Sequence, residues 1–252
     1  MKKFLSLTLA SIMVLGLVAC GQKAAAPASD GAAPTKLVMR TNAEFPPYEF
    51  KDGGELKGID VECAKLIGEK LGVEVEILDI AFDSLIPTVM SGKADFAMAG
   101  MTVTEDRKES VDFSHTYQTA VQTIVVPVDS AIQGVEDMYG KKIGVQTGTT
   151  GDIYCSDDFG DESMERYSKI IDGFQAMKSG KIDAIVVDDQ VAKAIVEQDS
   201  SSFKILETAY AEEDYAIAVK KGNKDLLDKI NTAIDEMKSN GQLKAIVDKY
   251  IK

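Results

Sequence analysis

Apolar and polar positions along the chain follow two periods, and their alternation predicts strands and helices in turn. Apolar residues between Asp60 and Gly72 recur at helical spacing, with Asp60 expected as N-cap and Gly72 as the end. Residues 73–80 alternate with period two, which is typical of a half-buried strand. Further strands are expected at 37–40, 96–99, 142–146 and 184–187, and helices at 84–90, 173–179, 190–198, 226–239 and 243–250. This order favours an α/β fold with parallel strands.

A five-residue pattern occurs twice and indicates two similar halves. Residues 91–95 read Ser-Gly-Lys-Ala-Asp and residues 179–183 read Ser-Gly-Lys-Ile-Asp, each between a predicted helix and a predicted strand. We expect each Gly to end its helix in a left-handed conformation and each Asp to start the next strand. Ligands of open α/β sheets bind outside the carboxyl ends of the strands. The expected site therefore includes residues 99–107 and 188–189.

The N-terminal residues predict export. Lys2 and Lys3 precede an apolar stretch, 4–18, that is too short for a comfortable membrane span and runs into Ala19 and Cys20. Small residues leading into Cys resemble the lipobox of bacterial lipoproteins, so we expect a signal peptide at 1–19 and lipid on Cys20; a plain secretory signal is the alternative. Residues 20–35, rich in Ala, Pro, Ser and Gly, are expected to be a flexible tether.

Charge and composition exclude several functions. The formal net charge of −13 makes nucleic acid an unsuitable partner. With one His and three Cys, the chain has no cluster at zinc spacing, so we expect neither a metal site nor a cofactor. Cys63 and Cys155 are expected as independent buried thiols, although export permits a disulfide. Nothing near Cys155 or His115 marks either as an activated catalytic group.

The residues at the predicted strand ends are complementary to a zwitterion. Thr102 and Arg107 follow one strand, and a planar guanidinium can clamp a carboxylate through two parallel hydrogen bonds. The loop 144–151 lacks the spacing of a P-loop or a dinucleotide fingerprint, but its backbone amides can receive an anion at a helix start. Asp188 ends an apolar strand in the other half and can hold an ammonium group.

These residues stand within a set of motifs that resembles the polar amino-acid-binding proteins of ABC importers. The motifs occur in order over nearly all of residues 36–252: Thr-Asn-Ala-Glu-Phe-Pro-Pro-Tyr-Glu-Phe (41–50), Gly-Ile-Asp-Val (58–61), Phe-Asp-Ser-Leu-Ile-Pro (82–87), Gly-Lys-Ala-Asp (92–95), Gly-Met-Thr-Val-Thr-Glu-Asp-Arg (100–107), Val-Asp-Phe-Ser (111–114) and Gly-Val-Gln-Thr-Gly-Thr-Thr (144–150).

The resemblance implies a two-lobed, Venus-flytrap α/β fold of the periplasmic-binding-protein type, in which each lobe is a sheet flanked by helices and two crossing segments form a hinge. We expect lobe 1 at 37–118 and 216–252 and lobe 2 at 119–215. The expected protein is a monomer, is not an enzyme, and is lipid-anchored on the outer face of the cell membrane. Its expected partners are an amino acid, an ABC permease and the permease's ATPase.

The same resemblance indicates which residues bind the carboxylate and the ammonium group of the ligand. Arg107, helped by the amides of Thr102 and Thr150, is expected to bind the carboxylate. Asp188, the Gly100 carbonyl and the Thr102 hydroxyl are expected to bind the ammonium.

The walls of the pocket are assigned in the same way. Phe45 and Phe82 match positions whose side chains sandwich the ligand, and Tyr48 matches a neighbouring aromatic residue; all three suit a cationic or amide side chain. Asn42 stands where many relatives have Asp, and Glu44 either replaces that charge or faces solvent. The choice between a basic ligand and one like glutamine or cystine stays open.

Two other functions remain as alternatives. An enzyme on the same fold, such as a dehydratase, would use Glu44 or Asp188 as acid or base, with a raised pKa beside the scissile bond. A sensor or adhesin that has lost transport would differ in its partner and not in its pocket.

Overall fold

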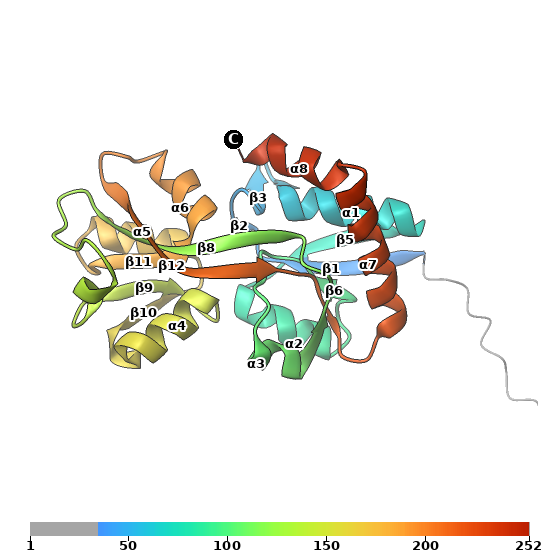
Figure 1. The fold of residues 1–252 in the computed structure, drawn as a ribbon, viewed down its shortest axis with the longest axis horizontal. Coiled ribbons are helices and arrows are strands. Elements are labelled where there is room, and N and C mark those ends of the chain that lie inside the picture. The colour runs from blue at the N-terminus through green and yellow to red at the C-terminus, as the bar shows by residue number, and fades with distance from the viewer. Residues whose placement is uncertain (1–34, 252) are drawn as a thin grey trace, which may run out of the picture. The chain divides into compact units, whose positions relative to one another are not determined.

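Two five-stranded sheets form the framework of residues 35–251, which are the part of the chain that the computed structural model describes (Figure 1). The predicted signal peptide, Cys20 and nearly all of the predicted tether lie outside these residues. Among the helices described, none has both the length and the apolar run needed to cross a membrane.

Lobe 1 is built on the sheet β5-β1-β6-β13-β7. Its strands are β1 (Lys36–Thr41), β5 (Glu74–Asp79), β6 (Phe96–Ala97), β7 (Val111–Phe113) and β13 (Ala218–Lys220). The helices packed around it are α1 (Ile59–Leu71), α2 (Leu85–Met90), α3 (Glu105–Ser110), α7 (Lys224–Ser239) and α8 (Gln242–Tyr250). A small sheet of β2 (Glu44–Phe45), β3 (Glu49–Asp52) and β4 (Glu55–Lys57) lies next to α1, and a short 3-10 helix, η1 (Phe82–Ser84), precedes α2.

Lobe 2 is built on the sheet β10-β9-β11-β8-β12. Its strands are β8 (Gln118–Pro127), β9 (Ile143–Gln146), β10 (Met164–Tyr167), β11 (Ala184–Asp188) and β12 (Phe203–Tyr215). Helices α4 (Thr150–Phe159), α5 (Ile170–Lys178) and α6 (Asp189–Val196) pack on this sheet, with two 3-10 helices, η2 (Val135–Met138) and η3 (Asp161–Ser163).

The predicted helices and apolar strands are present, but the expectation of parallel strands was only partly right. Strand β1 pairs in parallel with β5 and β6, and β9 pairs in parallel with β10 and β11. In contrast, β13 is antiparallel to both of its neighbours, and β8 is antiparallel to β11 and β12. Both sheets are therefore mixed. Sequence periodicity did not predict the long strands β8 and β12.

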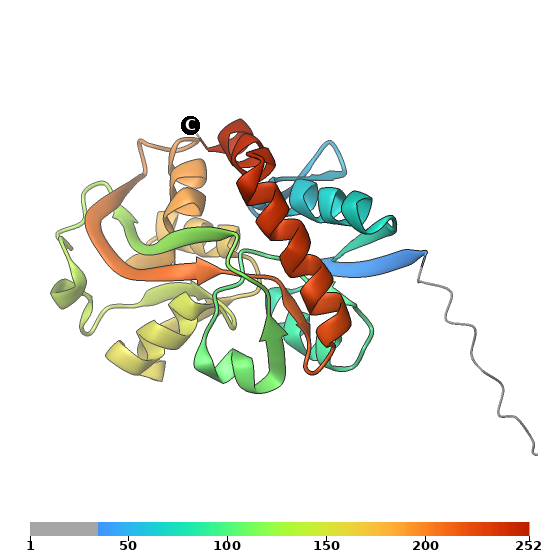
Figure 2. The same cartoon turned by 45° about the vertical axis from the view of Figure 1, so that its right-hand side comes forward.

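The chain crosses between the lobes twice, after β7 and after β12. The strands β8 and β12 lie side by side along their length, as Figure 2 also shows. The two crossings are tied together, because the amide of Ser114 donates to the carbonyl of Ile217 (2.9 Å) and the amide of Ile217 donates to the Ser114 hydroxyl (2.9 Å). Next to them, the amide of Tyr117 donates to the carbonyl of Tyr215 (2.9 Å).

The repeated pattern has the same geometry in both lobes. Gly92 has φ +72° and Gly180 has φ +71°, so both glycines adopt the left-handed conformation that was expected. Asp95 accepts a hydrogen bond from the amide of Val38 in β1 (2.7 Å), and Asp183 accepts one from the amide of Lys142, which precedes β9 (2.8 Å). Each Asp immediately precedes its strand and fastens it to the first parallel strand of its lobe.

The expectation that Asp60 caps α1 was wrong. Gly58 is the N-cap, and a Cβ there would lie 2.1 Å from the carbonyl oxygen of Tyr48, so only glycine fits. Asp60 is fully buried inside the first turn, and its Oδ2 accepts from the amide of Gly100 and from the hydroxyl of Tyr117, both at 2.8 Å. The carboxylate therefore links the helix to the segment that follows β6.

Candidate functional site

A small cavity lined by residues of both lobes gathers seven of the ten residues expected at the site. It is lined by Phe45, Phe82, Gly100, Thr102, Arg107, Thr150 and Asp188, together with Gln146 and Thr149. The volume open to a water-sized sphere is about 10 Å³, which is roughly the room that one water molecule needs. Residues of both lobes thus close over a common space.

Arg107 lies at the boundary between the lobes. The hydroxyl of Thr104 caps α3 by accepting from the Arg107 amide, which fixes the first turn that carries this side chain. The guanidinium donates through Nη1 to the carbonyl of Thr102 (2.7 Å) and through Nη2 to the carbonyl of Gly148 in lobe 2 (3.0 Å). It also lies 5.4 Å from the centroid of the Phe82 ring. Both terminal nitrogens therefore reach acceptors along the cavity wall.

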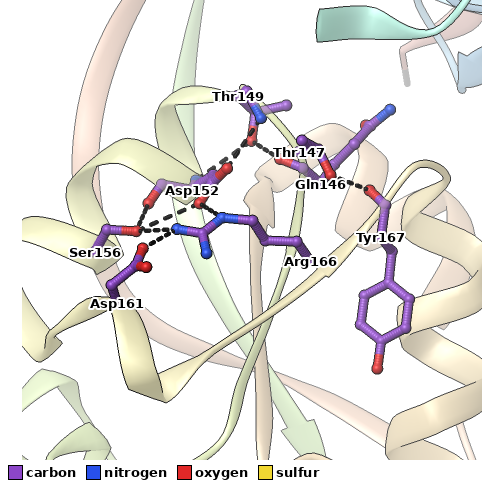
Figure 3. Close-up of polar contacts among 9 residues, drawn as sticks. Gln146, Thr147, Thr149, Asp152, Ser156, Asp161, Arg166 and Tyr167 are labelled. Atoms are coloured by element: carbon purple, nitrogen blue, oxygen red, sulfur yellow. Dashed lines mark hydrogen bonds and ion pairs between the residues drawn. The ribbon is translucent and has the colours of Figure 1, made fainter.

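The loop after β9 supplies the opposite wall and is held by a polar network (Figure 3). The hydroxyl of Thr149 caps α4 by accepting from the amide of Asp152. The Asp152 carboxylate accepts from the amide of Gly148 (3.0 Å) and from Nε of Arg166 (2.8 Å). Thr150 is the first residue of α4, and amides in a first helical turn have no partner within the helix.

Gly100 lies directly against an aromatic wall. Its φ is +52°, and a Cβ there would lie 2.8 Å from Cε1 of Phe45, so glycine is required for both conformation and space. Its amide is held by Asp60 in the bond described above. This arrangement leaves the carbonyl of Gly100 as its remaining backbone group at the cavity.

Asp188 ends β11, and the residue is 5% exposed. Oδ2 accepts from Nε2 of Gln122 (2.8 Å), and Oδ1 accepts from the hydroxyl of Tyr215. Burial and then the negative charge of Glu213 raise the pKa of Asp188 to about 7. A cation brought next to this group would stabilise its charged form and lower that pKa.

The three other expected residues do not line the cavity. Asn42 is buried and joins the lobes by accepting from Nε2 of Gln146 (2.7 Å). Glu44 pairs with Lys169 of lobe 2 (2.5 Å). Tyr48 is fully buried, with its ring 5.9 Å from that of Phe45, and its hydroxyl has no hydrogen-bond partner among the residues described.

Several residues of the site had no individual signal in the sequence analysis. Gln146 and Thr149 belong to the quoted motif 144–150 but were not singled out. Gln122, Glu213 and Tyr215 come from β8 and β12, the strands that periodicity missed. They form the polar layer behind Asp188 and Thr102.

The remaining candidate groups lie away from the cavity. Cys63 and Cys155 are free, buried thiols. His115 is exposed, and its ring Nδ1 is 2.9 Å from Asp235 on α7. Among residues 35–251, no group of three or more His, Cys, Asp or Glu side chains is arranged to hold a metal ion.

Comparison with known proteins identifies relatives along the whole of this fold. Residues 37–252 match the family described as "Bacterial extracellular solute-binding proteins, family 3". The arginine-binding extracellular protein ArtP of Bacillus subtilis (strain 168) is 37% identical over 255 residues, covering 99% of this chain and 98% of that protein.

Solved structures agree with this match. An ancestral arginine-binding protein bound to arginine is 44% identical, with a TM-score of 0.81 over 86% of this chain and 99% of the other. An ancestral arginine-binding protein bound to glutamine is 43% identical, with a TM-score of 0.82 over 86% of this chain and 98% of the other.

Proposed function

The chain belongs to the bacterial extracellular solute-binding proteins, family 3, and we propose that it captures a free polar or cationic L-amino acid in the cavity between its lobes. It is a solute-binding protein of an ABC transporter, with the two-lobed periplasmic-binding-protein fold. The observation that carries the proposal is that Arg107 of lobe 1 and Asp188 of lobe 2 line one cavity. A carboxylate and an ammonium on the same carbon can bridge these two side chains.

The proposed mechanism is closure around the ligand. We take residues 37–118 and 216–252 as lobe 1 and 119–215 as lobe 2, turning about the two crossings. The narrow cavity supports entry through an open form, in which the amino acid meets one lobe first. Moving the population from 1:99 to 99:1 in favour of closure requires about 5.5 kcal/mol of preference. Two or three hydrogen bonds to charged groups, at about 1.5–3 kcal/mol each, provide this when they form only on closure.

The ligand side chain is assigned to the aromatic wall. Phe45 and Phe82 line the cavity, and an aromatic face attracts a guanidinium or an amide. Glu44 is already paired with Lys169, so we assign it no contact with the ligand. Arginine is the first candidate, because ArtP and two ancestral relatives are named for it. Glutamine is the second, because one of the ancestral arginine-binding proteins was solved with glutamine bound.

Calorimetry with arginine and two truncated analogues tests the proposal. L-arginine should bind, whereas agmatine, which lacks the carboxylate, and the deaminated analogue, which lacks the ammonium, should each lose at least about a hundredfold in affinity. L-glutamine, L-histidine and L-cystine complete the screen. Agmatine binding as tightly as arginine would refute the role of Arg107, and heat from none of the amino acids would refute the proposed ligand class.

One observation bears on the enzyme alternative. Asp188 has the raised pKa that a catalytic acid needs, but burial and Glu213 cause it, and an ammonium lowers that pKa. The family consists of binding proteins, and we propose that this chain has no catalytic activity. Incubation with candidate amino acids and cyclohexadienyl acids should return them unchanged; any turnover lost in Asp188→Asn would contradict this.

We also propose that the protein is a monomer held on the outer face of the cell membrane by lipid on Cys20, after removal of residues 1–19. Cys20→Ser should abolish incorporation of labelled palmitate and release the protein from the membrane fraction. Cys63→Ser is the matched control and should stay with the membrane. Retention of the Cys20→Ser protein would contradict lipid anchoring.

A further inference from the structure

A second carboxylate lies behind Asp188. Glu213 of β12 is 6% exposed and Asp188 is 5% exposed. One side-chain amide bridges them, because Nε2 of Gln122 donates to Oδ2 of Asp188 (2.8 Å) and to Oε2 of Glu213 (2.9 Å). The other oxygen of Glu213, Oε1, is buried and has no hydrogen-bond partner among the residues described. Two acidic groups therefore share one donor in a site with little solvent.

Glu213 also orients a hydroxyl at the cavity. The Thr102 hydroxyl donates its only proton to Oε2 of Glu213 (3.1 Å). The hydroxyl oxygen of Thr102 also lies 3.4 Å from the hydroxyl oxygen of Thr150, so Thr150 is the donor in that contact. Toward any third group, the oxygen of Thr102 can act only as an acceptor. The ammonium group of an amino acid is a donor that can bond to this acceptor.

The carboxylate pair has no bonded cation. Within residues 35–251, the side chains that bond Asp188 and Glu213 are the uncharged Gln122, Tyr215 and Thr102, and the nearby Arg107 donates to backbone carbonyls instead. Two buried like charges without a partner disfavour each other, so the charged form of Asp188 is disfavoured beside Glu213. The pKa of Asp188, raised to about 7 by burial and by Glu213, agrees with this. The other titratable groups around the pair come from five elements or loops and are Tyr215, Arg107, Tyr154, Tyr48 and Glu49.

We propose that, in the ligand-free protein, Asp188 beside Glu213 holds a proton and releases it to solvent when the ammonium of the amino acid arrives, with Glu213 as the positioning residue of the ammonium subsite. This inference rests on the proposed function. In the step, one carboxyl O–H bond breaks, the proton goes to the buffer, and the ammonium keeps its own protons. The positive charge of the ligand then takes the place of the proton that Asp188 releases.

Affinity should therefore depend on pH in a defined direction. Below about pH 7, the ligand must displace a proton, so its dissociation constant should rise by up to about tenfold per unit fall in pH. Above that pH Asp188 is already ionised and affinity should level off. Glu213→Gln removes the like charge, which should move the start of this decline to lower pH.

Calorimetry in two buffers counts the proton directly. L-arginine, or L-glutamine if it binds more tightly, is titrated into the protein near pH 6.5 in phosphate and in Tris, whose ionisation enthalpies differ. The wild type should release about half to one proton per ligand, and Glu213→Gln should release clearly fewer. The matched control is Glu212→Gln, which changes the neighbouring exposed carboxylate on the same strand and should behave as wild type.

The outcomes separate the two proposals. Binding to wild type with the same heat in both buffers overturns the proton release and leaves the proposed function intact, and this result depends on no variant. Equal proton release by wild type and Glu213→Gln overturns the role of Glu213, provided that circular dichroism shows the variant folded. If no amino acid binds at all, the proposed function fails and this inference fails with it.

Discussion

Replacing Arg107 with lysine removes a two-nitrogen clamp and keeps the charge. In the structure, Nη1 and Nη2 each donate one proton to a backbone carbonyl, at 2.7 and 3.0 Å. Each of these nitrogens carries a second N–H, and the two together can bond both oxygens of a carboxylate. The single nitrogen of lysine is expected to bond one. Losing one hydrogen bond to a charged group costs about 1.5–3 kcal/mol, which corresponds to a loss of roughly 10- to 160-fold in affinity. Arg107→Ala loses both bonds, about 3–6 kcal/mol, or more than roughly a hundredfold.

Titration calorimetry with L-arginine measures both variants against wild type. Lys108→Ala is the matched control, because Lys108 is the next residue of α3, is exposed and, within residues 35–251, pairs with the exposed Glu105. Its affinity should stay within about threefold of wild type, since surface ion pairs contribute little. An Arg107→Lys protein that binds within threefold of wild type would refute the clamp, whatever Arg107→Ala does.

Three further predictions concern stability and accessibility. Burial raises the pKa of Asp60 to about 6, so its contribution to folding declines as pH rises from the unfolded pKa toward 6. Between pH 4 and pH 8, wild type should lose about 2.4 kcal/mol of urea-unfolding free energy relative to Asp60→Asn, and a constant difference would contradict this. Burial raises the pKa of the Cys63 thiol, and it raises the pKa of the Cys155 thiol to about 12. Both thiols should therefore react with Ellman's reagent only after denaturation, and fast labelling of the native protein would contradict this prediction. Lys169→Ala breaks the partly exposed pair with Glu44 and should weaken ligand binding by less than about fivefold by calorimetry; a larger loss would mean that the pair controls closure.

Much of the fold could be predicted where one face of an element is buried. Helix α1 has apolar residues at helical spacing and a left-handed glycine at its end, and Gly72 is that residue. The strands β8 and β12 could not be predicted in this way. Their pairing joins residues about 90 positions apart, and β12 has register shifts that interrupt its alternation. Long-range pairing of this kind leaves little local signal.

In the site, too, some residues could be placed from the sequence around them, whereas others depend on long-range strand pairing. Arg107 follows a predicted strand by a few residues, so its place at the cavity could be expected from the carboxyl-end rule. Glu213 could not, because Glu212, Glu213 and Asp214 together look like a solvated acidic run. In the structure Glu213 is buried while its two neighbours are exposed, which is the period of a strand. Only the knowledge that this segment is a strand separates the middle residue from the others.

The pair of hydrogen bonds between Ser114 and Ile217 has a consequence for transport. Under the proposed mechanism, twisting one crossing also displaces the other, because the two are hydrogen-bonded to each other, and this coupling favours motion of the lobes about one shared axis. A binding protein that moves about one axis presents two outlines to the permease: a closed one with the ligand bound and an open one without it. Under the proposed mechanism, the transporter can recognise cargo from the outline alone, without touching the amino acid inside.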